Sequence, residues 1–277
     1  MGRRKKKAER AYTSIEFLRS PDARTLRILA EFLEPQRRFR QHGIKSTIVF
    51  FGSARVKSRK ESLKRYRQVR EQIQRKRVAS KKLLQAYEQT KNDYEMSRYY
   101  EDARKLSAMV TKWAMSLDDD HKFVVCSGGG PGIMEAANRG ALTAGGKSIG
   151  LNITLPAEQF SNPYITEGLD FQFHYFFMRK LWFVYLAKAL VVFPGGFGTM
   201  DELMEALTLL QTGKVTKPLA VVIYGKKYWE EILNLKALIR YRMISRKDLN
   251  YIKMVDSPEE AFEYLKGTLM RNSSPRK

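Results

Sequence analysis

The stretch that decides the fold of this chain is Pro194-Gly195-Gly196-Phe197-Gly198-Thr199-Met200-Asp201-Glu202. It follows an apolar run, residues 189–193, that predicts a buried strand, and it leads into residues 200–211, which predict a helix. A glycine-rich turn between a strand and a helix presents backbone N–H groups at the helix N-terminus, where phosphate groups bind. The segment therefore predicts a phosphate site beside an acid, as in an enzyme that acts on a phosphorylated small molecule.

The acid of this segment, Glu202, has two interpretations. Thr199 and Glu202 have the Thr-x-x-Glu spacing of a capping box, in which both side chains bond to N–H groups of the helix N-terminus. The same carboxylate also lies close to the predicted phosphate site, where it could take part in catalysis. Its neighbour Asp201 fits a first-turn acid that the helix dipole favours. Capping and catalysis both remain open at this point.

Short apolar runs alternate with helical patterns along most of the chain. This alternation predicts a Rossmann-like α/β fold, a doubly wound parallel sheet with helices on both faces. The predicted strands are residues 47–51, 123–126, 148–153, 171–174, 189–193, 219–224 and 251–255. The predicted helices between and after them are residues 99–117, 133–143, 176–187, 200–211, 228–240 and 258–270. Ligands of such sheets bind beyond the carboxyl ends of the strands, where the glycine-rich turns also fall.

A second glycine-rich turn, Ser127-Gly128-Gly129-Gly130-Pro131-Gly132-Ile133-Met134-Glu135, follows the strand at residues 123–126. It fits either a nucleotide that lies close to the backbone or a tight turn that allows close helix packing. It is not a P-loop, because no Gly-Lys-Ser/Thr follows. Between the two turns, Arg179 and Lys180 interrupt an otherwise apolar helix. These cations either extend to solvent or reach a substrate phosphate or a carboxylate.

The chain has basic ends and a helical extension before the sheet. Residues 1–11 predict a basic disordered tail, and residues 12–43 predict helices in which Ser20-Pro21 starts the second helix and Pro35 ends it. Residues 44–270 predict the sheet domain, and residues 271–277 predict a second basic tail.

A strongly basic insert, residues 57–97, separates the first strand from the rest of the domain. Its sparse apolar residues recur at helical spacing, so it predicts a long basic helix or a helical hairpin. The charge fits either a solvated helical face or contact with the phosphate backbone of RNA or DNA. Several tyrosines either pack the helices or stack on bases: Tyr66, Tyr87, Tyr94, Tyr99 and Tyr100. The net charge of +22 for the whole chain also favours an anionic partner.

Composition narrows the class of protein further. The chain has 277 residues, 43% of them hydrophobic, which is enough for a sizeable core. Its one cysteine, Cys126, excludes an intrachain disulfide, and this fits a reducing compartment. No apolar run reaches the length of a membrane span, and the basic start leads into charged residues rather than an apolar signal segment. We therefore expect a cytoplasmic protein with no membrane partner and, since no second His or Cys accompanies His174, no metal site.

Four motifs, in this order, resemble those of the LOG (LONELY GUY) family, once described as lysine decarboxylase-like. They are Gly52-Ser53-Ala54-Arg55, the Gly-Gly-Gly-Pro-Gly-Ile-Met-Glu turn at 128–135, Arg179-Lys180, and the PGGxGTxxE signature at 194–202. The similarity runs from about residue 44 to residue 269, and the helical extension is similar to that of the longer bacterial type. The insert at residues 57–97 departs from the family, in which a short loop is expected there.

The resemblance implies a nucleoside 5′-monophosphate phosphoribohydrolase. Such an enzyme uses water to cleave the N-glycosidic bond of AMP or of a cytokinin riboside monophosphate, releasing the free base and ribose 5-phosphate. The resemblance implies no cofactor, and the pyridoxal-phosphate lysine of true decarboxylases has no counterpart here. Two alternatives remain: a protein that binds a nucleotide or a molybdopterin-type cofactor without turnover, and a nucleic-acid-associated protein that uses the basic insert.

The resemblance also assigns roles to residues. Arg179 and Glu202 would be the catalytic pair: Glu202 would stabilise an oxocarbenium-like cation or activate water, and Arg179 would orient Glu202 and hold the phosphate. A homodimer or a larger homo-oligomer is implied as well. The residues that would bind the substrate are Ser53, Gly129, Gly130, Gly132, Glu135, Met178, Lys180, Gly195, Gly196, Gly198 and Thr199.

Overall fold

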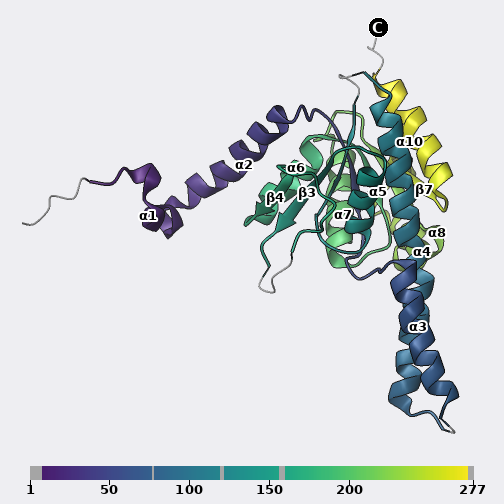
Figure 1. The fold of residues 1–277 in the computed structure, drawn as a ribbon. Coiled ribbons are helices and arrows are strands. Elements are labelled where there is room, and N and C mark those ends of the chain that lie inside the picture. The colour runs from purple at the N-terminus through teal and green to yellow at the C-terminus, as the bar shows by residue number, and fades with distance from the viewer. Residues whose placement is uncertain (1–7, 77, 119–121, 156–159, 274–277) are drawn as a thin grey trace, which may run out of the picture.

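Seven parallel strands form one sheet in the order β4-β3-β2-β1-β5-β6-β7 (Figure 1). The computed structural model describes residues 8–76, 78–118, 122–155 and 160–273. Their strands are β1 Thr47–Phe51, β2 Val124–Ser127, β3 Ser148–Ile153, β4 Asp170–Phe173, β5 Ala187–Val192, β6 Ala220–Tyr224 and β7 Ile252–Val255. Each strand begins and ends within two residues of its predicted bounds. The predicted doubly wound α/β fold is therefore confirmed.

The strand order places a switch point at the centre of the sheet. From β1 the chain proceeds outward through β2 and β3 to β4, and then returns to the other side of β1 with β5, β6 and β7. The crossovers that leave β1 and β5 therefore diverge in opposite directions, which opens a crevice beyond the carboxyl ends of these two strands. This crevice is where a ligand of a doubly wound sheet is expected.

Helices cover both faces of the sheet. They are α1 Ile15–Arg19, α2 Arg24–Gln41, α3 Arg59–Gln74, α4 Lys81–Met115, α5 Ile133–Thr143, α6 Phe176–Tyr185, α7 Phe197–Gln211, α8 Lys226–Ile232, α9 Leu235–Arg240 and α10 Pro258–Ser273. Successive strand residues point to opposite faces, so Ile48 packs under α4, α5 and α10, whereas Val49 packs under α2, α6 and α7. The two faces thus carry two separate apolar clusters. Because the strands are buried on both faces, their sequences are continuous apolar runs rather than alternating ones.

The helix α2 continues through Pro35 to Gln41, so the prediction that Pro35 ends this helix is wrong. Proline has no N–H group, which leaves the carbonyl of residue 31, one turn earlier, without its helical donor. Here the indole N–H of Trp182 in α6 donates to the Glu31 carbonyl at 3.0 Å. The Glu31 carboxylate in turn accepts from the backbone N–H groups of His174 (2.8 Å) and Tyr175 (3.2 Å). A tertiary contact therefore replaces the hydrogen bond that the proline removes.

Other helix bounds also differ from the prediction. The single helix expected at residues 228–240 is divided into α8 and α9, because Asn234 caps α9 by accepting from the Ala237 N–H at 2.9 Å. The last helix runs to Ser273, so residues 271–273 are helical rather than part of a tail. Within the tail predicted at residues 1–11, Ala11 already starts a 3₁₀ turn, and residues 1–7 lie outside the described residues, as do residues 274–277.

The basic insert is a helical hairpin formed by α3 and α4, which projects from the sheet domain (Figure 1). The predicted end of the insert at residue 97 falls inside α4, which is one continuous helix of 35 residues that includes the helix expected at residues 99–117. Its C-terminal half packs on α5, where the Ser107 hydroxyl donates to the Ala137 carbonyl at 2.5 Å. In the part of the chain that the structure describes, no helix is long and apolar enough to cross a membrane.

Replacing Trp182 with Phe tests the contact across Pro35. We expect Trp182→Phe to lower the free energy of unfolding by about 1–3 kcal/mol, because it leaves the Glu31 carbonyl without a donor. In a Pro35→Ala background the backbone N–H of residue 35 returns, so the same substitution should cost less. Urea unfolding of the four proteins gives this coupling energy. An equal cost of Trp182→Phe in both backgrounds would contradict the proposed replacement of the hydrogen bond.

Candidate functional site

Ser53 joins the turns that follow β1, β2 and β5. Its N–H donates to the Pro194 carbonyl at 3.0 Å, and its carbonyl accepts from the Ile133 N–H at 3.1 Å. Gly132 adopts a φ of +73°, and a Cβ atom there would lie 2.3 Å from the Ser53 carbonyl oxygen. Since neither this conformation nor this distance is open to a residue with a side chain, Gly132 allows the first two turns to approach each other.

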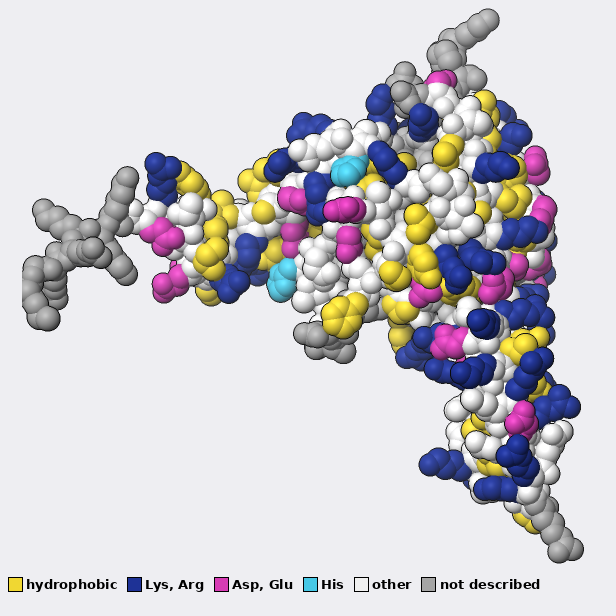
Figure 2. All heavy atoms as spheres, viewed as in Figure 1, with side chains coloured by type: hydrophobic (Ala, Val, Ile, Leu, Met, Phe, Trp, Pro, Cys, Tyr) yellow, Lys and Arg dark blue, Asp and Glu magenta, His cyan; other side chains and the backbone are white. Residues whose placement is uncertain are grey.

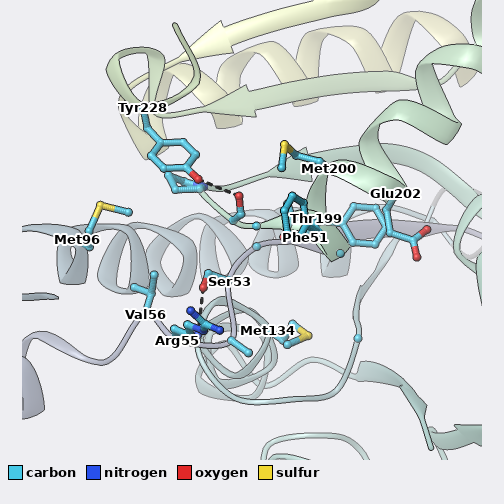
Figure 3. Close-up of a pocket in the computed structure, with 18 of the residues that line it drawn as sticks. Phe51, Ser53, Arg55, Val56, Met96, Met134, Thr199, Met200, Glu202 and Tyr228 are labelled. Carbon is cyan, nitrogen blue, oxygen red and sulfur yellow. Dashed lines mark hydrogen bonds between the residues drawn. The ribbon is translucent and has the colours of Figure 1, made fainter. Parts of the chain in front are cut away.

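A cavity of about 660 Å³ lies where these turns meet, within the usual size of a small-ligand site. The predicted site residues that line it are Ser53, Arg179, Gly195, Gly196, Gly198, Thr199 and Glu202. In Figure 3, Tyr228 and Met96 lie towards one end of the cavity and Glu202 towards the other, with Ser53 and Thr199 between them. The structure therefore brings the signature turn and the Arg179–Glu202 pair together at the switch point of the sheet.

The signature turn leads directly into α7. This helix begins at Phe197, and its N-cap residue, Gly196, has no side chain that could bond to the first N–H groups. The first N–H groups of a helix have no partner within the helix, so they remain available to an anion. A Cβ atom on Gly196 or Gly198 would meet no other atom within 4 Å, which shows that both glycines border open space. The Tyr228 hydroxyl fixes the turn by donating to the Gly195 carbonyl at 2.8 Å.

The start of α7 also decides between the two interpretations of Glu202. Thr199 lies inside the first turn of the helix rather than at its N-cap, so the capping-box interpretation is wrong. Glu202 instead lies in the second turn, 5% exposed, and no other residue that the structure describes forms a hydrogen bond with its buried Oε1 atom. Asp201 points elsewhere and pairs with Lys180 at 2.8 Å. Glu202 is thus the acid of the segment that faces the cavity.

Two cations lie near the Glu202 carboxylate without hydrogen-bonding to it. Arg179 Nη2 is 3.7 Å from Oε1 and Lys180 Nζ is 3.8 Å from Oε2. Burial raises the pKa of Glu202 to about 7, although Lys180 and Arg179 both favour the ionised form. Burial also lowers the pKa of Arg179, whose buried Nε atom has no hydrogen-bond partner within the described part of the chain. A buried carboxyl group that titrates near neutral pH in a cavity is typical of an acid–base residue.

The remaining predicted substrate-binding residues do not line this cavity. They are Gly129, Gly130, Gly132, Glu135, Met178 and Lys180. A Cβ atom on Gly129 would lie 2.4 Å from Asn152 Oδ1, and the Gly130 carbonyl accepts from Asn162 Nδ2 at 3.1 Å. The second glycine-rich turn is therefore a tight turn that packs closely against its neighbours, which was one of its two interpretations. Of its glycines, only Gly128 lines the cavity.

Contacts elsewhere in the fold explain why the side chains of Glu135, Met178 and Lys180 do not line the cavity. Glu135 accepts a hydrogen bond from the Tyr100 hydroxyl at 2.6 Å, which ties α5 to α4. Met178 is buried in the apolar cluster under α6. Lys180 pairs with Asp201 and with Glu205, at 2.8 Å from each.

Several cavity residues were missing from the sequence-based prediction. Asp93 and Met96 reach the cavity from α4, and Tyr228 reaches it from α8. No motif marks these positions, because their place depends on how α4 and α8 pack beside the turns. Arg55 also lines the cavity, and its place in the Gly-Ser-Ala-Arg motif was the one available signal. Over the described ranges, no three His, Cys, Asp or Glu residues are grouped so that they could hold a metal ion.

Comparison with known proteins gives a family match. Residues 134–265 match a family model described as possible lysine decarboxylase. The matched segment contains Arg179 and the complete signature at residues 194–202, and it begins at residue 134, near the end of the second glycine-rich turn at residues 127–135. No curated protein matches the sequence.

Several solved structures resemble this chain. TM1055 is 20% identical, and the alignment covers 62% of this chain and 89% of that one, with a TM-score of 0.42. The molybdenum cofactor binding protein of the phototrophic bacterium Rippkaea orientalis is 23% identical over 60% and 87% of the two chains, with a TM-score of 0.38. The molybdenum cofactor carrier protein of Chlamydomonas reinhardtii is 16% identical over 82% and 99%, with a TM-score of 0.41.

The burial of Glu202 predicts a pH-dependent stability. A carboxyl group whose pKa rises from 4.5 to about 7 on folding favours the folded state below pH 4.5, and this contribution is lost as the pH rises through 7. Glu202→Gln removes the ionisation. The free energy of unfolding of this variant relative to wild type should therefore increase by on the order of 3 kcal/mol from pH 5 to pH 8, and its relative melting temperature should increase with it. Calorimetry at both pH values measures the change.

Glu205→Gln is the matched control, because it makes the same chemical change one turn later on α7. The Glu205 carboxylate is about one-third exposed and bonded to Lys180, so no comparable increase is expected. A melting-temperature difference between Glu202→Gln and wild type that stays constant from pH 5 to pH 8 would show that Glu202 is not buried as described.

Proposed function

We propose that this protein hydrolyses a nucleoside 5′-monophosphate, as its resemblance to the LOG family implies. The family model that matches residues 134–265 bears the older description of that family, possible lysine decarboxylase. The family match supports a nucleotide-related function, and the hydrolase activity is the proposal. One observation carries it: the open N-terminus of α7, the buried Glu202 carboxylate and Arg179 border the same cavity. That arrangement suits a substrate with a phosphate group at one end and a bond to be broken nearby.

The reaction breaks the bond between C1′ of the ribose and the base, and water adds to C1′. The products are the free base, which receives a proton, and ribose 5-phosphate. In the proposed complex the substrate phosphate lies against the first N–H groups of α7, next to Gly196 and Gly198, so that the ribose extends towards Glu202. The positive end of the helix dipole then neutralises part of the phosphate charge.

Glu202 would act in its ionised form. Cleavage of the glycosidic bond develops positive charge on the ribose, and a carboxylate next to C1′ stabilises that charge or accepts a proton from the attacking water. Because Glu202 is 5% exposed, the interaction would take place where water screens it weakly, so its effect on the transition state is larger than at a surface. The raised pKa keeps part of the carboxyl population ready to exchange a proton near pH 7.

Arg179 would hold the substrate phosphate and keep Glu202 oriented. Its guanidinium lies 5.1 Å from the ring centre of Phe176 and 5.6 Å from that of Phe183, so two aromatic rings limit its movement. Its buried Nε–H has no hydrogen-bond partner among the described residues, and a guanidinium group binds phosphate oxygens in a bidentate manner. Lys180, in contrast, is engaged by Asp201 and Glu205 and is proposed to set the charge around Glu202 rather than to contact the substrate.

A base-release assay tests this proposal. Purified protein should release adenine from AMP or an N6-substituted adenine from a cytokinin riboside monophosphate, and Glu202→Gln should lower kcat by about 10²- to 10⁴-fold. Glu205→Gln should stay within about twofold of wild type, since its carboxylate does not line the cavity. Wild-type kcat/KM should rise with pH through about 7 as Glu202 ionises.

Two other outcomes of this assay would count against the hydrolase. Release of no base from any nucleoside monophosphate would overturn it. Saturable binding of a nucleotide or a molybdopterin-type cofactor without product would favour the alternative of a binding protein. If kcat of Glu202→Gln equals that of wild type, the hydrolase activity stands but Glu202 is not its catalytic residue.

We also propose the homodimer that the family resemblance implies. The outer face of α6, the helix that carries Arg179, exposes four large apolar side chains to between 39% and 52%: Phe176, Phe177, Leu181 and Tyr185. Apolar patches of this kind on a soluble domain mark interaction surfaces. Light scattering should give a multiple of the 32.2 kDa chain mass, and Leu181→Glu should lower it to one chain. A monomeric wild-type protein would contradict this surface.

A further inference from the structure

The hairpin of α3 and the first half of α4, here called the basic arm (residues 57–97), concentrates positive charge away from the cavity. It contains thirteen Lys and Arg residues and five Asp and Glu residues, and so it supplies +8 of the net charge of +22. Figure 2 shows Lys and Arg side chains distributed over the projecting hairpin. Like charges on one narrow hairpin repel each other, and an anionic partner would relieve this repulsion.

The outer face of α3 carries the cations that are most available. Lys60, Lys64 and Arg67 follow the spacing that puts residues on one side of a helix, and all three are exposed. The structure gives none of the three an ion pair with another described residue. Two neighbouring cations, in contrast, pair within the helix: Arg65 with Glu61 at 3.2 Å and Arg75 with Glu71 at 3.8 Å. The first three therefore form a stripe of accessible charge along α3.

The tyrosines of the arm face inward and hold the two helices together. The hydroxyl groups of Tyr66 and Tyr87 are 3.0 Å apart, and the ring of Tyr66 stacks on that of Tyr94 at 5.9 Å between centroids. Their role is therefore helix packing, one of the two interpretations of the sequence. Proteins that bind single strands stack bases on aromatic side chains, whereas the outer face of this arm offers cations. The arm suits a partner that presents phosphates on its outside.

We propose that the basic arm binds the phosphate backbone of a double-stranded nucleic acid without reading its base sequence. The sixteen residues of α3 extend about 24 Å, and a duplex carries one negative charge per ~1.7 Å of its axis. The rigid stripe of Lys60, Lys64 and Arg67 can thus lie along one duplex and release its counterions. Contacts of this kind position a protein on a duplex without distinguishing bases.

The continuous helix α4 connects the basic arm to the cavity. Binding of a nucleic acid by the arm does not depend on the proposed hydrolase activity. Arm residues Asp93 and Met96 of α4 line the cavity, and Tyr100 one turn further bonds to Glu135 of the sheet domain. The stripe on α3 lies outside the cavity lining. A duplex on the arm would therefore fix the cavity at a short distance from the nucleic acid, and it would leave the cavity open.

Fluorescence anisotropy with labelled duplexes of about 20 base pairs, as DNA and as RNA, tests the proposal over a salt series. The arm variant Lys60→Gln/Lys64→Gln/Arg67→Gln is compared with Lys227→Gln/Lys236→Gln/Lys247→Gln, which removes three exposed cations elsewhere. We expect the arm variant to bind at least about tenfold more weakly and to lower the salt slope by about 2–3, or roughly 0.9 per lost phosphate contact. The control variant should stay within about twofold of wild type.

Equal far-UV circular dichroism and melting temperature of the two variants establish that both remain folded. The proposal is overturned if both variants lose affinity equally, because the binding would then follow total charge rather than the arm. It is also overturned if wild type prefers the single strand of the same sequence. Binding to vesicles of anionic lipid without binding to either duplex would overturn it in favour of a membrane surface.

Discussion

The site depends on two backbone hydrogen bonds of Ser53. Through them the turn after β1 contacts the turn after β5 on one side and the start of α5 on the other. Their distances of 3.0 and 3.1 Å require backbones to approach each other without side chains between them, and Gly132 makes that approach possible. Because β1 and β5 flank the switch point of the sheet, this arrangement creates a cavity there and directs the N-terminus of α7 into it.

The buried carboxyl group of Glu202 destabilises the folded state, and neighbouring residues partly compensate for this. Burying a carboxyl group with one oxygen unpartnered destabilises the folded state, and the cations of Arg179 and Lys180, at 3.7 and 3.8 Å, offset part of this cost without forming hydrogen bonds. The compensation comes from α6, which Glu31 and Trp182 connect to α2. The helical extension therefore supports the helix that carries Arg179, although it does not line the cavity.

The long helix α4 explains why this fold can accept the basic arm. Its C-terminal half is the crossover helix between β1 and β2 and packs into the core, whereas its N-terminal half leaves the domain together with α3. Lengthening an existing crossover helix adds an arm without disturbing the sheet, since the added residues need no place in the core. The same continuity puts Asp93 and Met96 at the cavity, so the arm contributes to the site as well as to the surface.

Periodicity and glycine placement were enough to predict the parallel sheet, the edge at which ligands bind and the signature turn, because these features depend on neighbours along the chain. The switch point followed only from the strand order in the structure. The pair Arg179 and Glu202 came from the family resemblance, and the structure places both at the cavity. The tertiary structure alone decided that α2 passes Pro35, that Thr199 does not cap α7, and that α4 and Tyr228 border the cavity. Each of these outcomes depends on a partner from a distant segment, such as Trp182 for the Glu31 carbonyl, and local patterns carry no information about such partners.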